Sequence, residues 1–133
     1  MNGDSITDFR RLLANLPGMV YRCCNDANWT MLFISEGVEP LTGYRAQDLI
    51  NNQVVAFADL VFSDDIDLVN ERVQLGIETD GHFTVEYRIC RADGEIRWVW
   101  EQGHALFDKS GGISALEGYI TDITRRKTVE LKL

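Results

Sequence analysis

The residues best able to do chemistry are few and scattered along the 133-residue chain. There are two histidines, His82 and His104, and three cysteines, Cys23, Cys24 and Cys90. The adjacent cysteines would point to opposite faces of a strand, so they fit no zinc-ligand set, and the odd count does not suggest a disulfide framework. No nucleophile elbow, phosphate loop or metal motif accompanies the histidines. The sequence therefore predicts a domain that is not an enzyme and holds no metal.

The charge of the chain argues against two classes of partner. The 21 acidic and 13 basic residues give a net charge of −8. Nucleic acids and anionic membrane surfaces both reward clustered lysine and arginine, so we expect neither as a partner. No apolar run approaches the ~20 residues of a membrane span, and no signal-peptide pattern opens the chain. We expect a cytoplasmic fragment with reduced thiols, cut from a longer parent that could carry membrane segments elsewhere.

The last third of the chain reads as three consecutive strands. Residues 83–90, 96–107 and 115–124 are rich in strand-forming residues. The first two runs are separated by Asp93-Gly94 and the last two by a turn ending in Gly111-Gly112. Glycine supplies the positive φ that tight hairpin turns need. The pattern predicts an antiparallel three-stranded meander.

The preceding residues alternate between strand and helix signals. A hairpin is expected from strands at 19–24 and 31–35, and helix patterns occur at 5–16, 36–41, 45–50, 65–78 and from 125 onward. Ser63 and Asp64 can cap the long helix at 65–78, whereas residues 51–62 give no clear pattern. The order predicts an α+β fold: a five-stranded antiparallel sheet with helices on one face and a helix at each end.

Alternation along the meander divides its side chains between two faces. One set is Val85, Tyr87, Ile89, Val99, Glu101, Leu116, Gly118 and Ile120, and the other is Thr84, Glu86, Arg88, Trp98, Trp100, Gln102, Tyr119 and Ile123. The second set carries two tryptophans and a tyrosine, a patch that seldom stays exposed on a soluble monomer. We expect the first helix, a partner subunit or both to cover it, which predicts a homodimer. The packing residues would be Phe9, Leu12, Leu13, Trp98, Trp100 and Tyr119.

A dispersed series of short motifs runs from Leu16 to Lys127. In order, these are Pro17-Gly18, Phe33-Ile34-Ser35, Leu41-Thr42-Gly43-Tyr44, Asp64-Asp65, Glu86-Tyr87-Arg88, Asp93-Gly94, Arg97-Trp98, Gly118 and Asp122-Ile123-Thr124-Arg125-Arg126-Lys127. Together they resemble the PAS domain, in the subfamily that ends in the PAC motif. Phe62-Ser63 departs from the His-Pro that often precedes the paired aspartates. The resemblance implies a flanking helix at 1–17, a PAS/PAC core at 18–124 and the start of an exit helix at 125–133.

The resemblance also implies that the first set of side chains faces the helices and any ligand pocket. Candidate pocket residues are Tyr21, Cys23, Met31, Phe33, Leu41, Tyr44, Leu49, Val73, Tyr87, Ile89, Val99, Glu101 and Ile120. The competing interpretation is that these residues simply fill the core. An inward Glu101 would need a partner, which could be Tyr44, Tyr87, an arginine or a polar ligand. A shift of one position would instead place its carboxylate in solvent.

The resemblance to PAS domains also implies that the end of the last strand relays signals to an effector. Thr124 can cap the exit helix with its hydroxyl, and Asp122 can pair with Arg88, Arg91 or backbone donors. These two residues are the candidate signal relay. The alternative is that they form only a strand end and a helix cap.

The sequence identifies no cofactor, and two classes of cofactor are not expected. Haem-binding relatives take their axial histidine from the long helix, and residues 65–78 contain none. Photochemical flavin relatives carry a reactive cysteine on the short helices, where this chain has Asn51-Asn52-Gln53, and Ile120 stands where a polar flavin contact would be expected.

The resemblance implies a sensory input domain of a multidomain signalling protein of the histidine kinase or diguanylate cyclase type. A small ligand would bind the domain, and the terminal helices would pass the signal on. The alternative is a dimerisation or protein-docking module without a ligand.

Overall fold

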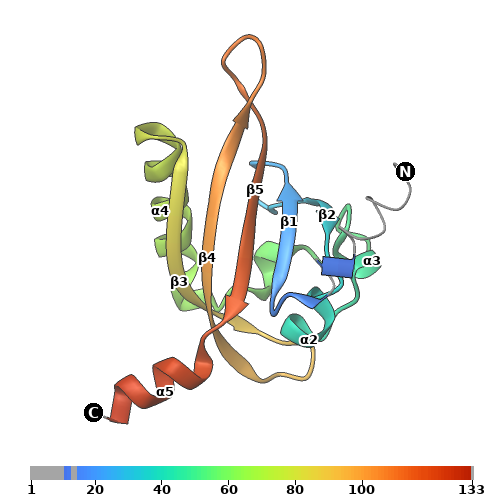
Figure 1. The fold of residues 1–133 in the computed structure, drawn as a ribbon, viewed down its shortest axis with the longest axis vertical. Helices are drawn as coiled ribbons and strands as arrows, with labels where there is room; N and C mark the ends of the chain where they lie inside the picture. The colour runs from blue at the N-terminus through green and yellow to red at the C-terminus, as the bar shows by residue number, and fades with distance from the viewer. Residues whose placement is uncertain (1–10, 13–14, 133) are drawn as a thin grey trace.

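The structure is a computed structural model that describes residues 11–12 and 15–132. Five strands form one antiparallel sheet in the order β2-β1-β5-β4-β3 (Figure 1). The strands are β1 (Met19–Cys23), β2 (Met31–Ile34), β3 (His82–Cys90), β4 (Ile96–Phe107) and β5 (Ile113–Asp122). The α+β fold, the first hairpin and the consecutive pairing of the last three strands are all confirmed.

Glycine-containing turns join the strands of the meander. Gly94 has a φ of +86° between β3 and β4, and Gly111 has a φ of +88° between β4 and β5. The Asp93 carboxylate accepts a hydrogen bond from the Glu95 backbone N–H at 3.0 Å, which supports the first turn. The β4–β5 turn extends beyond the rest of the sheet (Figure 1).

Short helices connect the hairpin to the meander, and a longer helix flanks β3. They are α2 (Val38–Thr42), α3 (Ala46–Leu49), the 3₁₀ turns η1 (Phe57–Leu60) and η2 (Ser63–Asp65), and α4 (Ile66–Thr79). The prediction that Ser63 or Asp64 caps α4 is wrong, because neither makes a side-chain capping bond. The tight turn η2 leads into the helix instead, and its last residue, Asp65, makes no capping bond, which leaves its side chain free for another contact.

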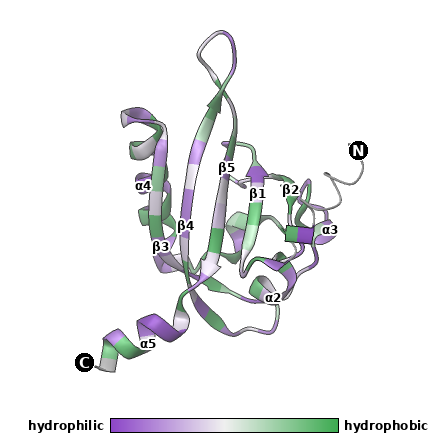
Figure 2. Cartoon of the chain, in the orientation of Figure 1, coloured by the Kyte–Doolittle hydropathy of each residue, from purple (hydrophilic) through white to green (hydrophobic). Residues whose placement is uncertain are grey.

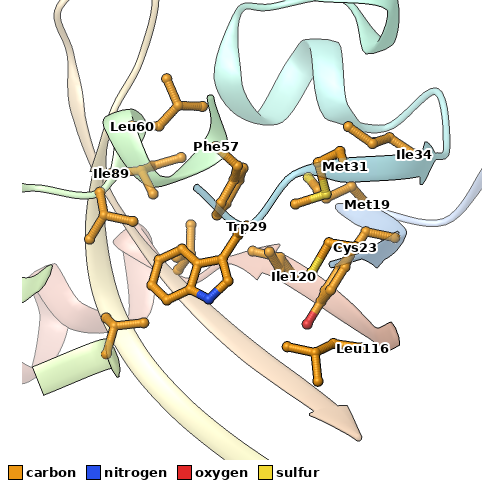
Figure 3. Close-up of a cluster of buried hydrophobic side chains, with 14 of the residues drawn as sticks. Met19, Cys23, Trp29, Met31, Ile34, Phe57, Leu60, Ile89, Leu116 and Ile120 are labelled. Carbon is orange, nitrogen blue, oxygen red and sulfur yellow. The ribbon is translucent and has the colours of Figure 1, made fainter. Parts of the chain in front are cut away.

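The helices and one face of the sheet enclose the core. Val69 and Val73 of α4 are buried, as are Val85, Tyr87 and Ile89 of β3. Figure 3 shows the part of this cluster where Trp29 and Phe57 approach side chains from the strands, including Ile89 and Ile120. The buried face is therefore the set of side chains that alternation grouped together and that the family resemblance predicted to face the helices.

The other face of the sheet, called here the outer face, carries the second set of side chains. In Figure 2, polar and apolar segments alternate along β3 and β4, as expected for strands with one buried face. Across the outer face, the Arg88–Trp98, Glu86–Trp100 and Thr84–Gln102 pairs lie opposite one another in β3 and β4. The outer face thus combines charged and aromatic side chains.

One candidate pocket residue falls on the wrong side of the sheet. Phe33 is 47% exposed, although alternation from the buried Met31 places it inside. The register between β1 and β2 shifts between Arg22 and Cys23, so that Leu32 is an extra residue in β2. A bulge of this kind breaks the two-residue period, and both Leu32 and Phe33 become exposed.

The predicted first helix lies mostly outside the described residues. Arg11, Leu12 and Asn15 are helical, and Leu12 is 65% exposed. Phe9 and Leu13, predicted to pack on the outer face, lie outside the described residues. At the other end, the exit helix is α5 (Thr124–Lys132), which points away from the sheet (Figure 1). Within 11–12 and 15–132, no helix is long and apolar enough to cross a membrane.

Candidate functional site

A carboxylate lies at the centre of the buried face. Glu101 of β4 is only 8% exposed. The Tyr87 hydroxyl donates a hydrogen bond to Glu101 Oε1 at 2.6 Å, and the Tyr21 hydroxyl donates to Oε2. Glu101 therefore points inward, and its partners are two tyrosines. Tyr87 was among the expected partners, whereas Tyr21 was expected only as a pocket residue.

Gly118 of β5 makes room for this arrangement. A Cβ atom at Gly118 would lie 2.6 Å from the Tyr21 hydroxyl and 2.5 Å from the Gln102 carbonyl oxygen. No side chain fits in that space without moving one of them. The glycine of the PAC-like motif thus lets β1 and β5 bring Tyr21 up to Glu101.

The buried environment of Glu101 favours the protonated forms of its carboxyl group and of the neighbouring tyrosine and cysteine side chains. Burial raises the pKa of the Glu101 carboxyl, while the hydrogen bonds from Tyr21 and Tyr87 act in the opposite direction. Burial, followed by the Glu101 charge, raises the pKa of both tyrosines and of the nearby Cys23 thiol. The Cys23 thiol is consequently not a reactive thiolate at neutral pH.

A small cavity borders Glu101. It is lined by Tyr21, Cys23, Trp29, Met31, Phe57, Val69, Val73, Phe83, Glu101 and Leu116. The centre of a water molecule can occupy about 10 Å³ of it. Because roughly 10–15 Å³ by this measure is the minimum for one water, the cavity holds no more than a water-sized molecule in this conformation.

The predicted pocket residues divide between this cavity and its surroundings. Tyr21, Cys23, Met31, Val73 and Glu101 line the cavity. Leu49, Tyr87, Ile89, Val99 and Ile120 are buried in the core without lining it. Leu41 of α2 is buried and also borders an open groove of about 940 Å³ between α2, α3 and the end of β5, whereas Tyr44 is only partly buried.

Five lining residues were not among the predicted pocket residues. Alternation places Leu116 in the set expected to face the helices, whereas Val69, one turn before Val73 in α4, and Phe83 follow the periods of their own elements, so periodicity could have added all three. Trp29 and η1 residue Phe57 carry no such signal, because they lie outside the regular elements that have a strong period. Trp29 also has a φ of +48°, a conformation that its side-chain type does not predict.

A hydrogen-bond network joins the end of β5 to α5. Arg97 Nε donates to Asp122 Oδ2 at 2.8 Å, and the Thr124 N–H donates to Asp122 Oδ1 at 2.8 Å. The Trp98 N–H donates to Thr124 Oγ1 at 2.8 Å. Burial raises the pKa of Asp122, but its hydrogen bonds with Arg97 and Thr124 outweigh that effect and lower it overall. The network, called here the β5–α5 junction, consists of Arg97, Trp98, Asp122 and Thr124.

The structure corrects two expectations for this junction and agrees with a third. Asp122 pairs with Arg97 rather than with Arg88 or Arg91. Asp122 also accepts a hydrogen bond from the Thr124 N–H, which is one of the backbone donors that the sequence allowed. The Thr124 hydroxyl accepts a bond from the Trp98 N–H of β4 instead of capping α5, because β4 lies close enough to supply this donor.

The first turn of α5 also binds the outer face. Lys127 Nζ lies 2.6 Å from Glu86 Oε1 and 5.0 Å from the centre of the Trp98 ring. Arg126 forms a second ion pair with Glu86. These contacts connect α5 to β3 and β4, the two strands that lie beyond β5 in the sheet.

Arg88 connects the start of α4 to the same tryptophan. Its guanidinium lies 4.3 Å from the Phe62 ring centre and 5.3 Å from that of Trp98. Arg88 Nη2 and Nε contact the two carboxylate oxygens of Asp65 at 2.6 and 2.9 Å. The Trp98 ring is therefore contacted by two cations: Lys127 from α5, and Arg88, which Asp65 at the start of α4 holds.

The remaining predicted packing residues lie on the outer face. Trp98, Trp100 and Tyr119 are each partly buried. The Tyr119 hydroxyl donates to the Pro17 carbonyl oxygen, so the chain enters β1 beside this aromatic patch. The position of the patch agrees with the predicted alternation, whereas its covering by a helix or a second subunit stays a prediction.

Comparison with known proteins gives a family match over most of the domain. A family model described as the PAS fold matches residues 31–120. Over 128 residues, the chain is 29% identical to the methyl sulfide methyltransferase-associated sensor of Methanosarcina acetivorans, covering 96% of this chain. Over 72 residues, it is 39% identical to the blue-light-activated histidine kinase of Brucella anthropi, covering 54% of this chain. These matches span only 13% and 14% of the two relatives' lengths.

Solved structures share the same fold. The PAS domain of a Colwellia psychrerythraea protein superposes with a TM-score of 0.75 at 19% identity, covering 90% of this chain and 98% of that one. A sensory box histidine kinase/response regulator from Burkholderia thailandensis gives a TM-score of 0.72 at 23% identity, covering 92% and 88% of the two chains.

Proposed function

Because the chain belongs to the PAS family, as the match over residues 31–120 shows, we propose that it is the regulatory input domain of a larger signalling protein. The two curated relatives, a sensor and a histidine kinase, are several times longer than the matched region, which supports an origin in a multidomain parent. The effector would follow α5 and would be of the histidine kinase or diguanylate cyclase type. Residues 1–17, 18–124 and 125–133 would act as the flanking helix, the sensory core and the start of the exit helix.

The β5–α5 junction carries this proposal. Asp122 lies opposite Val99 and follows two residues after Ile120, which lies opposite Glu101. A movement of β4 against β5 near Glu101 is therefore transmitted along paired strands to Asp122, and from Asp122 to the first N–H of α5. An input shifts such a system only through its different affinity for the two arrangements.

An Asp122→Ala substitution in the full-length parent tests the proposal. The substitution removes the Arg97 ion pair and the acceptor for the Thr124 N–H, so α5 loses part of its attachment while the sheet stays paired. We expect faster deuterium exchange in α5 than in β3 and β4, together with altered effector output. Asp67→Ala on the exposed side of α4 is the control. Unchanged effector output with a loosened α5 would contradict the proposal.

The input itself has two candidate forms. The first is a small ligand recognised by the Glu101 carboxylate and its two tyrosines, because a polar group in an apolar cavity fixes the orientation of a ligand. The roughly 10 Å³ cavity favours the second, a dimerisation or docking module that binds no ligand. Native mass spectrometry of protein purified without additives separates them. A retained small molecule supports the first, and a mass equal to that of one or two polypeptides with nothing added supports the second.

A further inference from the structure

Three polar side chains form a row across the outer face, near the end of the sheet opposite α5. His82 of β3 lies opposite His104 of β4, and His104 lies opposite Glu117 of β5. We propose that His82, His104 and Glu117 form a binding site for a divalent transition-metal ion, with Zn²⁺ as the best match. Two imidazoles and one carboxylate are a ligand set that Zn²⁺ accepts, with a fourth position left for water. This site is independent of the proposed regulatory role.

The two histidines form a close cross-strand pair. The Ala105 N–H donates to the Gly81 carbonyl oxygen at 2.8 Å, which places His82 and His104 in a non-hydrogen-bonded pair, the type whose side chains approach most closely. Their ring centres are 5.8 Å apart. With Zn–N distances of about 2.0–2.1 Å, two imidazoles on one ion have ring centres roughly 5–6 Å apart. The backbone thus sets the spacing that a shared ion requires.

Glu117 is oriented toward the same pair. Its Oε2 accepts from Arg22 Nε at 2.8 Å, and its Oε1 lies 3.6 Å from His104 Nε2. Two ligand atoms at about 2.1 Å from one tetrahedral ion lie roughly 3.4 Å apart, close to this separation. Arg22 therefore holds one oxygen and leaves the other directed at His104, as outer partners of metal-ligating carboxylates do.

The site is accessible and needs one side-chain adjustment. The His104 and Glu117 side chains are 43% and 31% exposed, and His82 is exposed. Among the described residues, no group of three or more histidine, cysteine or acidic side chains is placed so that it could hold a metal ion as it stands. The His82 ring must therefore turn toward Glu117, a rotamer change that exposed side chains make within nanoseconds.

Calorimetric titration of this chain with zinc chloride tests the site. We expect one ion per chain, and His82→Gln, His104→Gln and Glu117→Gln should each weaken binding by at least about tenfold, since even the outer partners of metal ligands are worth 10- to 100-fold. Cysteine is the main competing zinc ligand in the chain, so Cys24→Ser and Cys90→Ser are the matched controls and should bind as the unsubstituted chain does.

Unchanged binding after both histidine substitutions would overturn the proposal, as would loss of binding in either cysteine variant with the histidines intact. Histidine side-chain NMR gives a second readout. Equimolar Zn²⁺ should shift the imidazole nitrogens of His82 and His104 together, and Glu117→Gln should reduce both shifts. A spectrum in which neither imidazole responds to zinc would also overturn the site. The two histidines are on the surface, so their substitution leaves the core packing intact.

Discussion

Glu101 makes the stability of the domain depend on pH in an unusual direction. Burial raises the pKa of its carboxyl above the value in the unfolded chain, against the smaller effect of the tyrosine hydrogen bonds. The folded state therefore binds the proton more tightly than the unfolded state. The stabilisation from Glu101 is complete below the unfolded pKa, about 4.3, and is lost as pH rises through the folded pKa.

We predict that Glu101→Gln makes the domain relatively more stable as the pH increases. Glutamine keeps the shape of glutamate but has no charge to bury, and its oxygen can still accept a bond from one tyrosine. The free energy of unfolding, measured with urea from pH 4 to pH 8, should favour the variant increasingly toward pH 8. The carboxylates whose pKa is lowered, such as Asp65 and Asp122, contribute equally to the pH dependence of both proteins, so their contribution cancels in the difference. A difference that stays constant with pH would contradict this account.

At the scale of the elements, the ion pair between Asp65 and Arg88, and not a side-chain cap, holds the start of α4 in place. The Asp65 carboxylate accepts two bonds from the Arg88 guanidinium and a third from the Arg88 backbone N–H at 2.8 Å. These bonds fix the entry of α4 against β3, at the level where Phe62 and Trp98 enclose the guanidinium. The paired aspartates of the motif thus differ in role, since Asp64 is exposed and Asp65 is buried.

At this scale, Arg88→Lys should destabilise the domain by roughly 1–2 kcal/mol. Lysine keeps the charge but cannot form the two-pronged contact or stack its planar group between the rings. Urea unfolding gives the change in stability. Arg72→Lys, on the exposed side of α4, serves as the control and should change stability by less than about 0.5 kcal/mol. Equal effects at both positions would show that the Arg88 geometry contributes nothing beyond its charge.

The outer face is the surface of the whole molecule best suited to contact a second protein chain. Trp98, Trp100 and Tyr119 remain only partly buried, and the chain entering β1 reaches this face at Pro17. An aromatic surface of this kind, bordered by the charged Glu86 and Lys127, is typical of an interface core with a polar rim. We therefore retain the prediction that two copies pair through the outer face.

For the whole molecule, we expect a dimer that forms as the protein concentration rises. Trp100→Ser should raise the dissociation constant of this dimer at least about tenfold, because the loss of an aromatic anchor has an effect of this size in other interfaces. Analytical ultracentrifugation of the 133-residue chain measures the dissociation constant. Leu75→Ser, which removes an apolar side chain that is 55% exposed on α4, should leave the dissociation constant unchanged. A monomer at all concentrations, or equal weakening by the two substitutions, would exclude this interface.

The sequence by itself determined the elements and most of the buried face. Alternation in residues 83–90 and 96–107 puts Tyr87, Val99 and Glu101 on one face, because the period of a strand is a local property. The family resemblance indicated that this face is the inner one and left an outward Glu101 open, and the structure buries all three side chains. The turn at Asp93-Gly94 and the long helix before β3 follow from equally local chemistry. The order of the short motifs along the chain also indicates the PAS family, which the match over residues 31–120 confirms.

Only the tertiary structure decided which distant residues meet. The bulge that exposes Phe33, the choice of Arg97 for Asp122 and the approach of Tyr21 to Glu101 all depend on the register between paired strands. The pairing of His82, His104 and Glu117 depends on register in the same way. A strand's own residues specify which face each side chain occupies, but the partner strand and the loops decide what lies opposite it.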